Sequence, residues 1–160
     1  TQDRSSAASD VYKRQTDRWS EDSHMTPVAE LTHSLSVAGQ IQPEDVQALA
    51  EHGYQVIICN RPDNEEPNQP SMDAVAAACE IAGIQFVRYP VDAMSFPGED
   101  LDAMDEAMNG DEKVLAYCRS GARSTNLWVA TLAGDERLAA AERAQQFGFP
   151  LTFVMQLGFS

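Results

Sequence analysis

The sequence predicts an α/β domain with a mostly parallel central sheet of four to five strands, flanked by helices. Short apolar runs, several of them rich in β-branched residues, alternate with amphipathic segments from residue 35 to residue 147. This alternation of strand and helix is typical of sheets that carry helices on both faces. The length of 160 residues suits one domain, and a hydrophobic fraction of 43% is ordinary for a soluble globular protein.

Each expected element has its own signal in the sequence. The continuous apolar run 55–59 indicates a strand buried on both faces, 35–39 indicates a short edge strand, and 84–89 and 114–117 indicate two more strands. Helices are expected over 43–52, 71–82, 97–109 and 135–147, from Pro or from a capping Ser or Asp at their starts and Gly at several ends. Another helix, over about 122–133, is apolar on nearly all sides and should be central and buried.

The chain is expected to have three segments. Residues 1–24 show no periodic apolar pattern and are predicted to be a disordered or non-native leader, followed by the folded domain over 25–149. Residues 150–160 form an apolar tail that either packs on the domain or continues into a longer chain. No apolar stretch approaches the ~20 residues of a membrane span, so no membrane partner is expected.

Composition argues against several classes of function. The formal net charge of −14 disfavours binding to nucleic acid or to anionic membranes. Cys59, Cys79 and Cys118 form no CxxC pair, and the three histidines have no metal-ligand spacing, so neither a metal site nor a cofactor is expected. An odd number of widely spaced cysteines suits a reducing, cytoplasmic location, and Cys59 and Cys79 lie in apolar patterns that indicate core positions.

The strongest chemical signal is the segment 114–125, VLAYCRSGARST. A short strand ends at Cys118, a tight Ser/Gly/Ala loop follows, and Arg123 then opens a long helix. Loops of this kind bind anions through backbone N–H groups and a helix N-terminus, and that environment favours a cysteine thiolate. From residue 25 on, only seven Lys or Arg residues stand against twenty Asp or Glu, and two of the seven are Arg119 and Arg123. Cys118 is therefore a candidate nucleophile, at the strand ends where parallel sheets bind ligands.

The spacing from Cys118 to Arg123 separates two chemistries. Four residues lie between them, as in sulfurtransferases of the rhodanese type, whereas cysteine phosphatases have five. Residues 117–124, YCRSGARS, closely resemble the rhodanese loop, and the His that usually precedes a phosphatase cysteine is missing.

The rest of the chain resembles a different group. The stretches 37–45 (VAGQIQPED), 56–63 (VIICNRPD) and 83–91 (GIQFVRYPV) are similar to dual-specificity phosphatase-like domains. Combined with the loop, they resemble one family over about residues 25–148: the phosphatase-like domain of beta-lactamase hydrolase-like proteins. The resemblance implies a cysteine-phosphatase-like fold. Members of this family occur alone or fused to a metallo-hydrolase of the persulfide dioxygenase type, so such a hydrolase is an expected partner.

The resemblance also implies roles for the residues of the loop. As a thiolate, Cys118 would attack the outer sulfur of a persulfide or thiosulfate and carry sulfane sulfur as a persulfide. Arg123 would orient this small anionic substrate through its planar guanidinium. The remaining members of the anion-binding loop are Arg119, Ser120, Gly121, Ala122 and Ser124, of which Ser124 is expected to donate a hydrogen bond to the thiolate.

Two other functions stay open at this point. A protein-tyrosine or dual-specificity type of phosphatase, acting on phosphate esters, would use Asp92 as the general acid; otherwise Asp92 is a solvated loop carboxylate. A redox sensor or anion-binding module would use Cys118 without turnover, although no resolving cysteine lies nearby in the sequence.

Four further residues are weaker candidates. Arg61 and Asp63 follow a predicted strand, where they either buttress the loop or form an ion pair or a turn. Met94 and Phe96 either shape the rim of the pocket or pack in the core.

Overall fold

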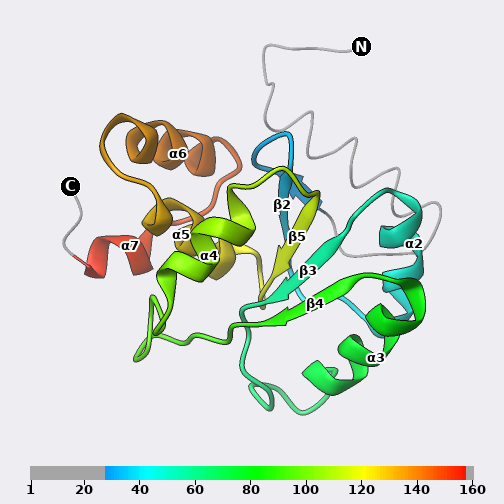
Figure 1. Ribbon diagram of the computed structural model, residues 1–160. Coiled ribbons are helices and arrows are strands. Elements are labelled where there is room, and N and C mark those ends of the chain that lie inside the picture. The colour runs from blue at the N-terminus through cyan, green and yellow to red at the C-terminus, as the bar shows by residue number, and fades with distance from the viewer. Residues whose placement is uncertain (1–27, 158–160) are drawn as a thin grey trace.

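The computed structural model describes residues 28–157, which form a five-stranded sheet between two layers of helices (Figure 1). The strand order is β1-β2-β5-β3-β4, so the strand that leads to residue 118 lies in the middle of the sheet. The predicted α/β class with a mostly parallel sheet is confirmed. The leader predicted over residues 1–24 and the expected start of the domain at residues 25–27 lie outside the described residues.

Four strands run parallel to one another: β2 (Leu35–Ala38), β5 (Val114–Tyr117), β3 (Val56–Cys59) and β4 (Gln85–Arg88). Every residue of β2, β5 and β3 is buried, as expected for strands covered on both faces. The prediction that 35–39 is an edge strand is wrong. The short β1 (Val28–Glu30) pairs antiparallel with β2 and covers its outer side.

The two faces of the sheet are covered by different helices (Figure 1). On one side lie α2 (Val46–Glu51) and α3 (Met72–Ala82), and a 3-10 turn over Pro43–Asp45 precedes α2. On the other side lie α4 (Leu101–Met108), α5 (Ala122–Thr131), α6 (Gly134–Gln146) and α7 (Thr152–Gln156). Residues 124–130 of α5 are all buried because α4, α6 and α7 pack around it, which confirms the predicted central helix.

Helix ends follow the capping rules at some positions and depart from them at others. The Ser71 hydroxyl accepts a hydrogen bond from Ala74 N–H (3.1 Å) and so caps α3 as predicted. The helix expected from residue 97 begins only at Leu101, because the Asp100 side chain provides its cap and the preceding residues form a loop. The cap expected at Asp135 is also wrong, since α6 already begins at Gly134.

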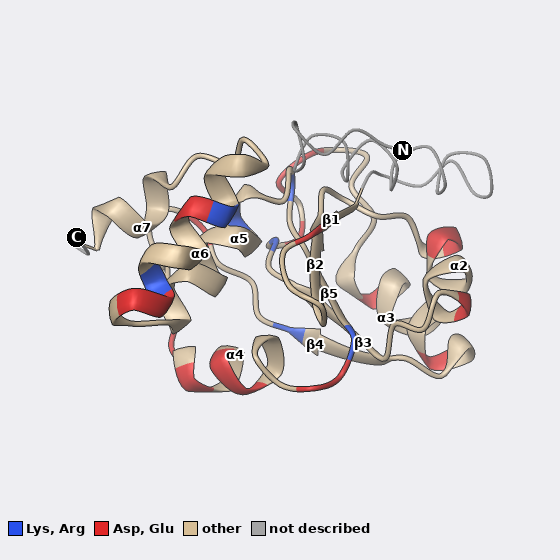
Figure 2. Cartoon of the chain, turned by 90° about the horizontal axis from the view of Figure 1, so that it is seen from above, with Lys and Arg blue, Asp and Glu red and all other residues tan. Residues whose placement is uncertain are grey.

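The tail of the chain packs on the central helix. The amide side chain of Asn126 accepts a hydrogen bond from Val154 N–H (3.0 Å) and donates one to the carbonyl of Pro150 (2.9 Å). Val154 is buried, so α7 joins the core layer around α5. Acidic residues are spread over the outer surfaces of helices on both sides of the sheet (Figure 2). Within residues 28–157, no helix has both the length and the apolar composition that crossing a bilayer requires.

Candidate active site

The site lies where the four parallel strands end. Because parallel strands present their carboxyl ends at one edge of a sheet, the segments after β2, β3, β4 and β5 converge there. Backbone hydrogen bonds continue beyond the strands: Gln40 N–H donates to Arg119 O (3.3 Å), Asn60 N–H to Tyr117 O (2.8 Å) and Val91 N–H to Asn60 O (3.1 Å). The loop after β5 is therefore held by its neighbours on both sides.

Cys118 lies at the base of this loop and is 1% exposed. Its Sγ accepts a hydrogen bond from Gly121 N–H at 3.1 Å, and its own N–H donates to Ala38 O at 3.3 Å. The hydroxyl of Ser124, which is fully buried in the first turn of α5, has no hydrogen-bond partner among the described residues. A backbone N–H on the sulfur and an unpaired buried hydroxyl are groups that can stabilise negative charge in this loop.

Gly121 gives the loop its shape. Its φ of +96° lies in the left-handed region that favours glycine, and it is the residue from which α5 begins. A Cβ at this position would lie 3.1 Å from Cε1 of Phe149, so a side chain has little room there. The sharp turn allows the chain to leave β5 and to start α5 at Ala122, with only three residues between Cys118 and the helix.

Arg123 is anchored by the neighbouring strand ends. Its terminal nitrogen NH1 donates to Val91 O (2.9 Å) and to Asn60 O (3.4 Å), and its side chain is only 14% exposed. NH1 also lies 3.1 Å from one carboxylate oxygen of Glu65, and NH2 lies 3.4 Å from the other. The Nε atom is buried and has no partner within residues 28–157, so one donor of this guanidinium is left for a ligand.

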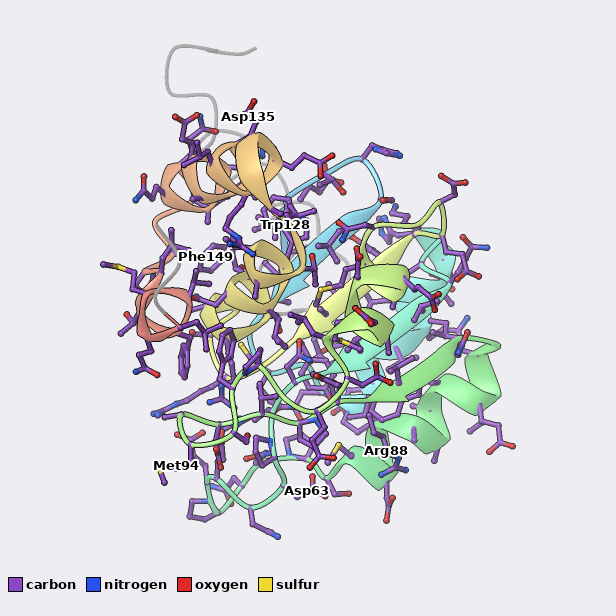
Figure 3. All side chains as sticks on the ribbon, turned by 60° about the vertical axis from the view of Figure 1, so that its left-hand side comes forward. Asp63, Arg88, Met94, Trp128, Asp135 and Phe149 are labelled. Carbon is purple, nitrogen blue, oxygen red and sulfur yellow. The ribbon has the colours of Figure 1, made fainter. Side chains whose placement is uncertain are left out.

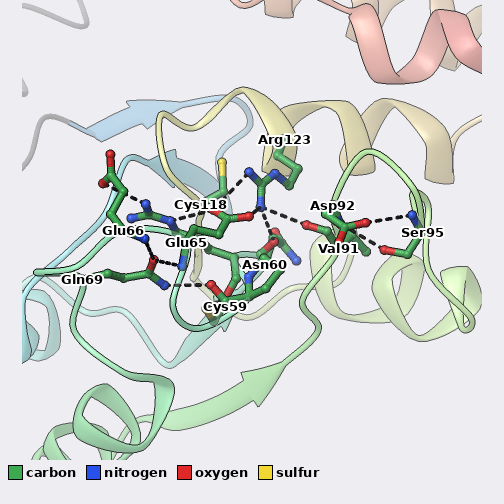
Figure 4. A network of polar contacts seen from close by, with 12 residues as sticks. Cys59, Asn60, Glu65, Glu66, Gln69, Val91, Asp92, Ser95, Cys118 and Arg123 are labelled. Carbon is green, nitrogen blue, oxygen red and sulfur yellow. Dashed lines mark hydrogen bonds and ion pairs between the residues drawn. The ribbon is translucent and has the colours of Figure 1, made fainter.

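Behind the loop lies a chain of alternating charges. Figure 4 labels three of its members, Glu65, Glu66 and Arg123. Arg61 is 1% exposed and donates to Glu65, Glu66 and Gln40, each at 2.9 Å. Glu65 also pairs with Arg123, and Glu66 pairs with Arg119 at 3.0 Å. The pKa of Glu66 is lowered, first by its hydrogen bond from Arg61 and then by the charge of Arg119. We call this set of five charged residues the arginine–glutamate chain.

Asp92 lies on the loop after β4, near Arg123 (Figure 4). Its side chain is exposed and accepts hydrogen bonds from Met94 N–H and Ser95 N–H, both at 3.0 Å. These contacts, with that from Ser95 N–H the strongest, hold the pKa of this carboxyl below its ordinary value. In this structure the Asp92 carboxylate therefore caps its own turn.

Only part of this site is predictable from the sequence. Arg61 forms the ion pairs that were one of its two expected roles, whereas the Asp63 carboxylate accepts from Met72 N–H (2.8 Å) at the start of α3. The glutamates Glu65 and Glu66 were not among the candidates. Their position in the sequence could have identified them, because they lie on the loop that follows β3 and the loops after the parallel strands meet at this edge.

Residues 94 and 96 have opposite environments. Met94 is 95% exposed and points away from the body of the domain at the tip of its turn (Figure 3). Phe96 is buried and its ring packs against Phe153 with centroids 5.2 Å apart. Phe96 is therefore a core residue, and so are Cys59 and Cys79, each 2% exposed or less. Burial raises the pKa of the Cys79 thiol to about 11.

A cavity lined mostly by polar residues, here called the polar cavity, lies next to Arg61 and Glu66, and none of residues 118–124 is in its wall. It has a volume of about 420 Å³, lies between residues 40–42 and 66–70, and has Arg61 and Glu66 in its wall. This volume is within the range of pockets for small organic ligands. Within residues 28–157, no group of three or more His, Cys, Asp or Glu side chains is arranged to hold a metal ion.

The segment that contains Cys118 and Arg123 also matches a known protein family. Residues 28–135 match the family described as the beta-lactamase hydrolase-like protein, phosphatase-like domain. The chain belongs to this family. A beta-lactamase hydrolase-like protein of Xylella fastidiosa strain Temecula1 is 34% identical over 116 residues, which is 72% of this chain and 27% of that protein. The chain thus spans about a quarter of the length of the curated relatives it matches.

Solved structures show the same fold as this phosphatase-like domain. A phosphatase candidate from Neisseria meningitidis Z2491 is 32% identical, with a TM-score of 0.64 over 80% of this chain and 94% of that one. A Cys-to-Ser variant of Pseudomonas aeruginosa TpbA, in complex with phosphotyrosine, has a TM-score of 0.54 and 14% identity, over 81% of this chain and 78% of its own. At 14% identity the second likeness concerns the fold alone. Both confirm the predicted cysteine-phosphatase-like architecture.

The conformation of Gly121 leads to a testable prediction. Gly121→Ala should lower the free energy of unfolding by about 3 kcal/mol, because it adds left-handed backbone strain and overlap with Phe149. Gly83→Ala is the matched control, since Gly83 has a φ of +80° but no atom within 4 Å of the added Cβ. Denaturant unfolding of both variants measures the difference. Equal losses would show that the contact with Phe149 does not matter.

Proposed function

We propose that this domain is a cysteine-dependent phosphatase in which Cys118 takes the phosphoryl group of a small phosphate ester. The observation that carries the proposal is the placement of Cys118 Sγ at the base of the loop that opens α5, with Gly121 N–H at 3.1 Å. The family match and the likeness to the Neisseria meningitidis phosphatase candidate support it. The main interpretation of the sequence, sulfur transfer, becomes the second candidate because the comparisons support the phosphatase alternative and not sulfur transfer.

The proposed reaction has two steps. The Cys118 thiolate attacks phosphorus, so that an S–P bond forms while the P–O bond to the leaving group breaks and the leaving oxygen gains a proton. Water then attacks the phosphorus of this thiophosphate intermediate, which releases inorganic phosphate and restores the thiolate. Backbone N–H groups of residues 119–123 and the unpaired Nε of Arg123 bind the phosphoryl oxygens, and the Ser124 hydroxyl stabilises the departing thiolate.

Other parts of the site have supporting roles in this proposal. Asp92 gives the leaving group its proton, because it follows β4 at the edge where Arg123 is anchored. The polar cavity beside Arg61 and Glu66 accommodates the remainder of the ester.

The role of Cys118 as the nucleophile can be tested by substitution. Cys118→Ser should lower the rate of hydrolysis of an aryl phosphate by about 1,000-fold or more, because a serine hydroxyl is a far weaker nucleophile than a thiolate. Cys79→Ala is the control, since Cys79 lies in α3 on the opposite side of the molecule from α5, and this variant should keep the wild-type rate. Continuous release of the phenol measures both rates. A Cys118→Ser protein that hydrolyses the ester normally would contradict the proposal.

The role of Asp92 as the proton donor predicts a pH dependence of the hydrolysis rate. The pKa of Asp92 is lowered, so its protonated form is scarce near neutral pH and increases about tenfold for each pH unit of acidification above that pKa. The ratio of the wild-type rate to the Asp92→Asn rate should therefore rise as the pH falls from about 7 to about 5. Taking the ratio cancels titration of the substrate. A ratio that does not change with pH would assign Asp92 to the turn alone.

A second candidate function is favoured by one specific observation, the length of the loop. Four residues separate Cys118 from Arg123, one fewer than in the cysteine phosphatases that the sequence also resembles. A shorter ring of N–H groups suits a single sulfur atom better than a tetrahedral group. In this sulfurtransferase the Cys118 thiolate attacks the outer sulfur of thiosulfate, the S–S bond breaks, sulfite leaves, and a persulfide remains on Cys118.

Thiosulfate distinguishes the two candidates. Incubation with thiosulfate should add the mass of one sulfur atom to wild-type protein and none to Cys118→Ala, and cyanide should then release that sulfur as thiocyanate. Sulfur on Cys118 together with negligible hydrolysis of the aryl phosphate would favour the transferase. Protein that stays unmodified and turns over the phosphate would exclude it.

A redox role for Cys118 is the third possibility. Cys59 lies in register with Tyr117, one residue before Cys118, so a second thiol lies at the same edge of the sheet. Burial raises the pKa of the Cys59 thiol, and that thiol donates to Arg61 O (3.2 Å), so Cys59 is a poor thiolate. A reversible mixed disulfide on Cys118 without turnover of either substrate would favour this role. The expected metallo-hydrolase partner stays a prediction.

A further inference from the structure

The guanidinium of Arg123 is already occupied by a carboxylate of the chain itself. Both oxygens of Glu65 face it, at 3.1 Å from NH1 and 3.4 Å from NH2 (Figure 4). Glu65 comes from the loop after β3, and its Oε1 also accepts from the buried Arg61 at 2.9 Å. A carboxylate held from two sides in this way is a fixed part of the site.

The arginine–glutamate chain lowers the net positive charge around the loop. Arg61, Arg119 and Arg123 contribute three positive charges, whereas Glu65 and Glu66 contribute two negative ones. Ionised Cys118 would cancel the remaining positive charge. A loop that would otherwise be strongly cationic is therefore close to neutral.

Two buried hydrogen-bond donors without partners still indicate that the loop binds an anion. Arg123 Nε and the Ser124 hydroxyl have no partner among the described residues. They are the donors that an anion over Cys118 can use while Glu65 stays on NH1 and NH2. The site thus offers a ligand these two hydrogen-bond donors but little excess positive charge.

We propose that Glu65 determines the charge of the anion that this site accepts, so that singly charged ligands are favoured over doubly charged ones. The proposal rests on the proposed function in taking residues 118–124 as an anion-binding loop. It narrows the substrate class to ligands that present one negative charge to the loop, such as the monoanion of a phosphate ester or a persulfide.

The physical reason is the product of charges in Coulomb's law. Repulsion between Glu65 and a dianion is twice that between Glu65 and a monoanion at the same distance. Removing the charge of Glu65 should therefore change the logarithm of the affinity twice as much for a dianion. If the monoanion gains about threefold, the dianion gains about tenfold.

Calorimetric titration with sulfate and with methanesulfonate tests this proposal, because the two ligands share a tetrahedral SO₃ face but differ by one charge. The variant is Glu65→Gln, which keeps an oxygen acceptor for Arg61 and Arg123. The matched control is Glu66→Gln, which removes the charged partner of the 66% exposed Arg119 and one of the two charged partners of Arg61, but no partner of Arg123. Glu65→Gln should raise the affinity for sulfate about tenfold and that for methanesulfonate about threefold, while Glu66→Gln should change their ratio little.

The outcomes separate this proposal from the proposed function. An unchanged ratio of the two affinities in Glu65→Gln, or no binding of either anion to that variant, would overturn the role of Glu65. An equal change in Glu66→Gln would overturn it as well. Because binding needs no chemistry at Cys118, a shifted ratio would stand even if Cys118→Ser turned out to be without effect on phosphate hydrolysis. Thermal unfolding of each variant checks the fold, and Glu65→Ala repeats the test if Glu65→Gln is unstable.

Discussion

The buried guanidinium of Arg61 is the constraint on which the organisation of this site depends. A positive charge at 1% exposure is costly unless its donors are satisfied and its charge is paired. Arg61 lies two residues after the end of β3, so its partners had to come from segments at the same edge of the sheet. Glu65 and Glu66 come from the same loop and Gln40 from the loop after β2, and together they accept from all three of its nitrogens.

The same pairing couples the scaffold to the reactive loop. Each glutamate that satisfies Arg61 has a second oxygen or a second contact for an arginine of the loop, Arg123 or Arg119. The backbone carbonyls of Asn60 and Val91 hold Arg123 from the other side. The position of the Arg123 guanidinium is thus set by the segments that follow two strands, β3 and β4, and the loop after β5 is tied to both of them.

The sequence predicted the scaffold better than the contacts around the site. The parallel strands, the central helix after Cys118 and the Ser71 cap all follow from local patterns, because burial on both faces and helix capping leave clear signals. The three-residue β1 leaves no such signal, so β2 was expected at the edge. The start of α4 was misplaced because Asp100 provides its cap while Tyr89 OH donates to Pro97 O (2.7 Å) and accepts from Asp100 N–H (3.0 Å), a contact across 8 to 11 residues. Glu65 and Glu66 differ from the many other surface carboxylates only in their position after β3, and the fold then brings them to the arginines.

Asn126 has a consequence for how this protein should be handled in the laboratory. The family match ends at residue 135, yet the amide of Asn126, fully buried in α5, is satisfied by Pro150 and Val154. An expression boundary drawn at the end of the match would remove these two partners. The Asn126 amide nitrogen would keep its bond to Ala122 O (2.7 Å), but the Asn126 Oδ1 would be left unpaired in the helix that carries Arg123. Recombinant versions of the domain should therefore extend at least through Leu157, which packs against the same core.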